Sequence, residues 1–132
     1  MLVRAADRLA EPGYLDLARQ TARTCAALAP RMPLVAQCCG LAGVGELLVD
    51  VAVASGPGTG PGGGTGAEEF WDAADAVAAI LLSRSGGPPS RPVFPDTGLA
   101  RPSATWAGGS AGVLGFLRRL HERGGPRLGL LD

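Results

Sequence analysis

Two adjacent cysteines, Cys38 and Cys39, are the residues of this chain whose type and spacing most clearly suit chemistry. Neighbouring cysteines rarely bond to each other, because a disulfide needs a Cα separation and Cβ directions that adjacent residues seldom offer. Two thiolates on one turn can instead face a single soft cation, and the positive end of a following helix favours the ionised thiolates. Zinc is the first candidate cation, and the pair would supply two of its ligands.

The alternative is that the two cysteines are simply buried, since free cysteine packs as a small hydrophobe. The residues that follow favour the metal site, because Gly40 and Gly43 stand where a helix should begin. Glycine costs about 1 kcal/mol relative to alanine inside a helix. Its use here indicates that something requires the close backbone approach that glycine permits.

The glycine pattern after the cysteines occurs a second time. Segment 40–48 reads Gly-Leu-Ala-Gly-Val-Gly-Glu-Leu-Leu, and segment 109–117 reads Gly-Ser-Ala-Gly-Val-Leu-Gly-Phe-Leu. The first Gly, the Ala, the second Gly, the Val and the last Leu match position for position. An internal repeat predicts a repeat architecture and outweighs local propensity as an indicator of fold. Each copy is predicted to be a glycine-rich start followed by an apolar helix.

Segment 38–43, Cys-Cys-Gly-Leu-Ala-Gly, resembles the zinc motif of the lanthionine synthetase C-like (LanC-like) cyclase family, usually Cys-His-Gly-x-Ala-Gly. Segment 106–120 resembles the last repeat of the same family, and the resemblance covers about residues 14 to 123. The chain is most similar to the cyclase domains at the C-terminal end of actinobacterial kinase-cyclase lanthipeptide synthetases. The resemblance implies an all-α fold, a partial α/α toroid of alternating outer and inner helices. Glycine-rich starts of the inner helices would face a central cavity with zinc at its mouth.

The resemblance also implies a function, that of a zinc-dependent peptide cyclase in the intact parent protein. Its partner would be a precursor peptide carrying dehydroalanine or dehydrobutyrine and a cysteine, whose thiolate adds to the alkene to close a thioether ring. Cys38 and Cys39 would bind Zn2+. The family's third ligand is a cysteine of the preceding inner-helix repeat, which this chain lacks, and the acid-base residues would also lie upstream. We therefore expect residues 1–132 to be a C-terminal fragment of a cyclase domain, completed by upstream helices and with a kinase-like domain as a further candidate partner.

The chain departs from the family motif at Cys39, where histidine is usual. Cysteine remains a ligand that zinc accepts, at about 2.3 Å, and it adds negative charge to the site. We expect that charge to make a substrate thiolate on the zinc more nucleophilic. Cys25 lies in a predicted outer helix, where burial explains it better than metal binding. His121 and the basic run around it, 118–123, are interpreted as the solvated end of the last helix.

Apolar periodicity and helix-breaking residues place these motifs on alternating outer and inner helices. The expected helices are 1–9, 14–28 (outer), 40–55 (inner), 67–83 (outer) and 110–121 (inner), with Pro12 as a stop after the first. A Gly/Pro-rich loop, 56–66, and a Pro-rich excursion, 86–102, with 93–94 as a candidate strand, connect them. The loop lacks the Lys-Ser/Thr ending of a phosphate-binding loop.

Composition limits the partners. Net charge is zero, which gives no strong attraction to nucleic acid or to an anionic membrane. The longest apolar run, 76–82, is too short to span a bilayer. The first residues do not read as a signal peptide, so the three cysteines are expected to be reduced thiols in the cytoplasm.

Two other functions stay open from the sequence. The first is a non-catalytic remnant, a helical scaffold or peptide-binding module without metal. The second is another α/α-toroid enzyme acting on carbohydrates or prenyl groups, whose chemistry needs a pair of carboxylates. Glu46 and Asp50 lie four residues apart on the predicted cysteine helix and could supply that pair, or could form an ion-paired or solvated face.

Overall fold

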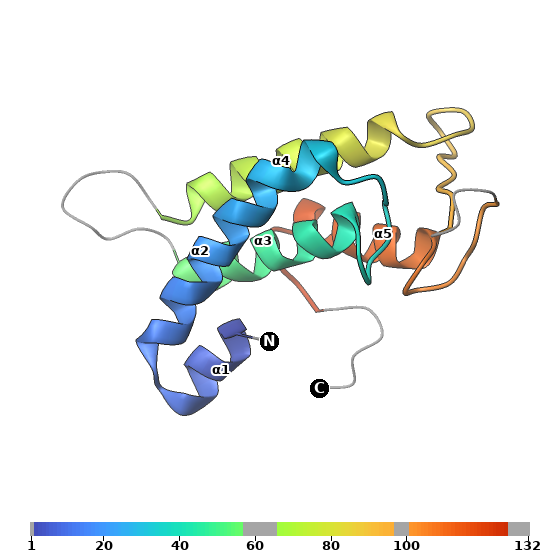
Figure 1. Cartoon of the computed structure of the whole chain (residues 1–132). Helices are drawn as coiled ribbons and strands as arrows, with labels where there is room; N and C mark the ends of the chain where they lie inside the picture. The colour runs from blue at the N-terminus through green and yellow to red at the C-terminus, as the bar shows by residue number, and fades with distance from the viewer. Residues whose placement is uncertain (1, 57–65, 97–100, 127–132) are drawn as a thin grey trace.

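The regular structure is helical throughout the part of the chain that the computed structural model describes, residues 2–56, 66–96 and 101–126. Its elements are α1 (Leu2–Leu9), α2 (Pro12–Leu28), the short 3-10 helix η1 (Ala29–Arg31), α3 (Leu41–Ser55), α4 (Glu68–Ser83) and α5 (Ser110–His121) (Figure 1). Within these residues β pairing is limited to two isolated bridges, Gly86 with Val93 and Pro95 with Pro102. The described chain is therefore all-α, as the sequence predicted.

The ends of the helices follow from local sequence. Glu68 and Glu69 occupy the first turn of α4, where negative charge suits the helix dipole. The start of α2 differs from the prediction, because Pro12 begins this helix instead of only ending the one before. Proline at the first position of a helix loses no hydrogen bond and has the right φ, and the Glu11 side chain accepts a bond from the Gly13 N–H.

The core is built around α3, in which nine of 15 residues are buried. A helix buried on most of its circumference must be covered from several sides. It packs most extensively against α4 and also against α2 and α5, while α1 packs mainly against α2 (Figure 1). The largest fully buried side chains are Leu41, Leu48, Val49 and Val51 of α3, Phe70, Val77 and Leu81 of α4, and Val113 and Phe116 of α5.

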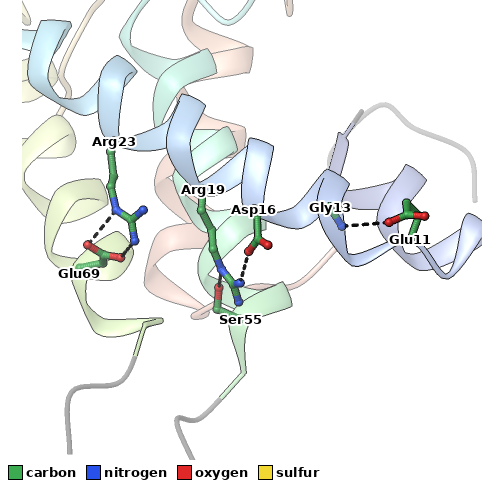
Figure 2. A network of polar contacts seen from close by, with 7 residues as sticks. All are labelled: Glu11, Gly13, Asp16, Arg19, Arg23, Ser55 and Glu69. Atoms are coloured by element: carbon green, nitrogen blue, oxygen red, sulfur yellow. Dashed lines mark hydrogen bonds and ion pairs between the residues drawn. The ribbon is translucent and has the colours of Figure 1, made fainter. Parts of the chain in front are cut away.

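Polar contacts on the surface connect α2 to α3 and α4 (Figure 2). The Arg23 guanidinium on α2 pairs with the Glu69 carboxylate on α4 through two nitrogens. Arg19 donates to the Ser55 hydroxyl at the end of α3, with an Nε–Oγ distance of 3.2 Å, and also pairs with Asp16. The Glu69 pKa is lowered, first by the hydrogen bond from Arg23. These pairs hold the outer side of the bundle together but are exposed, so each contributes little stability.

The connections differ in how they meet the core. The Pro-rich excursion is anchored by Phe94, which is buried, and the candidate strand at 93–94 is reduced to a single bridge at Val93. The Gly/Pro-rich loop predicted over 56–66 falls mostly outside the described residues.

None of the helices in the described part of the chain combines the length and apolar content that a bilayer span would need.

Candidate metal centre

The cysteine pair lies in a turn, residues 37–40, that leads directly into α3. The Sγ atoms of Cys38 and Cys39 are 3.1 Å apart, and both side chains are exposed. The two sulfurs thus converge on one side of the turn at the start of the helix, where the sequence placed them. Burial as small hydrophobes, the alternative considered for the pair, does not describe them.

The glycines of the motif let the chain fold tightly over itself before α3. The N–H of Leu41 donates to the carbonyl of Leu34, with an N–O distance of 3.0 Å, so the backbone returns to within bonding distance after seven residues. A Cβ at Gly40 would come within 2.5 Å of the Leu34 carbonyl oxygen, and one at Gly43 would overlap the carbonyl oxygen of Gln37. The close approach that the sequence predicted is therefore made by the chain's own backbone.

The second copy of the motif folds in the same way before α5. Ser110 donates to the carbonyl of Ser103 at 2.7 Å, which repeats the bond between Leu41 and Leu34 sixty-nine positions later. A Cβ at Gly109 would overlap the carbonyl oxygen of Ser103, and one at Gly112 would overlap that of Trp106. The sequence repeat is thus a structural repeat, with one equivalent backbone bond and the same steric need for glycine.

The two repeated helices lie side by side and parallel. Three contacts join them in the same order along both, pairing Cys38 with Ala107, Gly45 with Phe116 and Asp50 with Arg119. The first is a backbone bond, in which the Cys38 N–H donates to the Ala107 carbonyl at 3.0 Å. Equivalent positions of the two repeats therefore meet at the turn. The two helix axes are therefore parallel, with the glycine-rich starts at the same end.

The contact in the middle of the pair sets how closely α3 and α5 approach. A Cβ at Gly45 would overlap the ring of Phe116, and that ring is fully buried. The absence of a side chain at Gly45 thus creates the hollow that the aromatic ring fills. This places the backbone of α5 against α3 and brings the 106–109 turn beside the cysteines.

In the middle of α3, the carboxylates of Glu46 and Asp50 pair with a buried arginine. Arg119 is 5% exposed and pairs with Glu46, which is 6% exposed, and with Asp50, whose Oδ1 lies 3.0 Å from Nη2. The interpretation of segment 118–123 as a solvated helix end is therefore wrong for Arg119. Its three-residue spacing from Phe116 places it on the buried face of α5, which the sequence could have indicated.

Both carboxylates accept hydrogen bonds from Arg119. They therefore form the ion-paired face that the sequence left open for them. A cavity of about 680 Å3 borders Asp50 and Arg119, and Val53 is also in its wall. The cavity therefore opens at the end of α3 remote from the cysteines.

The electrostatics of the cysteine turn differ from the expectation that the helix start favours thiolates. The pKa of Cys39 is raised, first by its hydrogen bond with Cys38, then by desolvation and by charge repulsion from Cys38. Segments 32–45 and 102–117, which form the two turns and their flanks, contain no charged residue. The neighbouring Cys38 side chain therefore disfavours the thiolate form of Cys39.

The donor set fits zinc at two positions. The two sulfurs come from one turn, point to the same side and are open to solvent. Across the described residues, no three or more His, Cys, Asp or Glu side chains gather into a set that could hold a metal. Cys25 lies on α2, half-buried against the core, and His121 is exposed at the end of α5. Cys25 thus occupies the packing role that the sequence predicted.

No protein-family model matches this chain, and none of the curated proteins matches its sequence.

Proposed function

We propose that this chain is the C-terminal part of a zinc-dependent peptide cyclase that forms thioether rings. The observation that supports it is the convergence of two exposed thiols, Cys38 and Cys39, at the start of the first of two structurally repeated parallel helices. Soft thiolate donors on one turn are the kind of ligand that zinc prefers. The resemblance of segment 38–43 to the LanC-like zinc motif gives this site its proposed reaction.

The proposed architecture is a segment of an α/α toroid. Helices α3 and α5 would be inner helices, since both begin with the same glycine turn and lie parallel in contact. Helices α2 and α4 would be outer helices, since each packs on α3 and they also touch each other. Alternation of the two kinds along the chain is what a toroid built from helix pairs requires.

The role of the chain's own residues is to hold the metal and keep one side of it open. Cys38 and Cys39 would bind zinc, and the cross-repeat bond to Ala107 would fix the backbone that carries them. Bound zinc would lower the pKa of a substrate cysteine, so that its thiolate is available at neutral pH to add to a dehydroamino acid. A further protein ligand and the acid-base groups are proposed to come from the remainder of the cyclase.

Zinc binding is the direct test of the site. The metal-free chain is titrated with Zn2+ against a chromophoric chelator, and bound zinc is counted by elemental analysis. We expect Cys38→Ser and Cys39→Ser each to weaken zinc binding at least tenfold, because each removes one of the two thiolates. Cys25→Ser is the matched control and should bind as the parent does. A chain that takes up no zinc would instead support the metal-free helical scaffold.

The reaction is tested with a dehydrated precursor peptide and the cyclase that contains this chain. Thioether formation removes a free thiol without changing the mass of the peptide, so alkylation followed by mass spectrometry counts the rings. We expect Cys38→Ala to reduce ring formation at least tenfold and Cys25→Ala to leave it nearly unchanged. The opposite pattern would show that the ligands have been assigned to the wrong cysteines.

A further inference from the structure

We propose that the cysteine turn is a site of reversible oxidation, at which Cys38 and Cys39 form a disulfide with each other when the chain meets a small-molecule disulfide. The oxidation goes beyond the proposed function, because it needs only these two thiols and holds whether or not the turn binds zinc.

The two sulfur atoms already lie close together. The Sγ atoms of Cys38 and Cys39 are 3.1 Å apart. A disulfide bond is about 2.05 Å long, so the two sulfurs need to approach each other by only roughly 1 Å. Cys25 is the remaining cysteine of the chain, and it lies on α2, half-buried against the core. The turn therefore holds the thiols that are best placed to react with each other.

Both thiols are exposed, so a small disulfide can reach either of them. The backbone that carries them can also adjust. The first bond of α3 runs from the Val44 N–H to the Gly40 carbonyl, so the regular helix begins after the cysteines. Segments 32–45 and 102–117 contain no charged residue, so an uncharged reagent is the one that suits this surface.

The same geometry makes the bond reversible. Adjacent Cα atoms are about 3.8 Å apart across a trans peptide, and disulfides usually join Cα atoms about 4.4–6.8 Å apart. The rarity of bonds between neighbouring cysteines follows from this mismatch, which strains the disulfide. Strained or exposed disulfides are the ones that are readily reduced and that serve regulation. A thiol reductant should therefore reopen the bond.

The oxidation proceeds by two thiol–disulfide exchanges. One cysteine, as its thiolate, attacks a sulfur of the reagent, whose S–S bond breaks, and one reagent thiolate leaves and takes up a proton. The second cysteine then attacks the protein sulfur of the mixed disulfide and releases the other half of the reagent as a thiol. The two cysteines lose two electrons and two protons, and the reagent gains both. The chain becomes about 2 Da lighter.

The disulfide has a consequence for the proposed zinc site. The thiolate is the form of cysteine that binds metal, and a disulfide contains none. Oxidation and zinc binding would therefore exclude each other at Cys38 and Cys39. In the proposed cyclase, the oxidised turn would be an inactive form that reduction restores.

Peptide mass spectrometry tests the disulfide on the whole chain. The reduced chain is treated with hydroxyethyl disulfide, and the remaining thiols are alkylated before digestion. Trypsin cleaves after arginine, so Cys25 falls in peptide 24–31 and the pair falls in peptide 32–84. We expect peptide 32–84 to be about 2 Da lighter than its reduced form and to carry no alkyl group. Reduction with a phosphine should restore both alkylation sites.

Single substitutions show which thiols form the bond. Cys38→Ser and Cys39→Ser should each stop at the mixed disulfide and keep half of the reagent, because the second thiol is gone. Cys25→Ser is the matched control and should form the disulfide as the parent does. Circular dichroism of each variant shows that it is folded. Two reagent halves or two alkyl groups on peptide 32–84, or a bond between two chains, would overturn the proposal.

A parallel reaction with Zn2+ separates this disulfide from the proposed function. Bound zinc should slow the oxidation about tenfold or more, because it occupies both thiolates. A chain that forms the disulfide equally fast with zinc present would support the redox site and contradict the zinc site. A chain that binds zinc but forms no disulfide when zinc is removed would overturn the redox site alone.

Discussion

Substitution of Gly45 by alanine tests the packing that places α3 and α5 side by side. Replacing it by alanine adds a methyl group where the Phe116 ring lies, and both positions are buried. Alanine is favoured over glycine within a helix by about 1 kcal/mol. Overpacking a filled core costs about 1–3 kcal/mol. A fully buried ring has little space to move away, so we expect the cost of overpacking to exceed the gain in helix propensity. Gly45→Ala should therefore lower the free energy of unfolding by roughly 1 kcal/mol.

A double-mutant cycle separates the overlap from general effects of the substitution. Phe116→Leu removes part of the ring, so Gly45→Ala should cost less, or become stabilising, when leucine stands at position 116. Urea unfolding followed by circular dichroism gives the four free energies. Gly13→Ala is the matched control, since a Cβ at Gly13 meets only the Glu11 side chain at 3.4 Å, and it should not destabilise. If the effect of Gly45→Ala is the same on both backgrounds, the two residues are not in contact and the parallel pairing of α3 and α5 is refuted.

Three further outcomes follow from contacts already described. Arg119→Met should cost about 3–5 kcal/mol in urea unfolding, because it breaks a buried ion pair with the Glu46 carboxylate and a second pair with Asp50. Cys39→His should retain zinc binding in the chelator competition, since imidazole is an accepted ligand, whereas Cys39→Ala should not. The lowered pKa of Glu69 means that its pair with α2 stabilises the fold above the unfolded pKa and is lost as pH falls through the folded pKa. Glu69→Gln should therefore flatten the acid limb of a stability–pH curve slightly, and an unchanged limb would contradict the pairing.

The repeat made much of the fold predictable from sequence. The glycine spacing at 40–43 and 109–112 gave the start of two helices, and α5 was predicted with its observed bounds. Pro12 was misread as a stop because the same residue suits the first turn of a helix and the end of one. Only its neighbours distinguish the two roles, and here Glu11 caps the helix that Pro12 begins.

The contacts between the two repeats were harder to predict, because they depend on how far α3 and α5 are shifted and rotated relative to each other. Gly45 looked like one more glycine of the motif, and nothing local shows that it faces Phe116. Arg119 was assigned to solvent because it lies in a basic run, although its spacing from Phe116 places it on the buried face. The raised pKa of Cys39 was also missed, because the helix start was weighed and the effect of Cys38 on its neighbour was not.

The bond between the Cys38 N–H and the Ala107 carbonyl also bears on the order in which the chain is made. Chains are synthesised from the N-terminus at about 5–20 residues per second, so position 107 follows position 38 by roughly 3 to 14 seconds. During that interval the cysteine turn lacks the backbone partner that holds it, and α3 lacks the ring that covers Gly45. The nascent chain thus displays two vicinal thiols before the second repeat arrives to fix them. In the proposed zinc site, metal binding by the fully held cysteine turn would therefore follow the docking of α5 against α3.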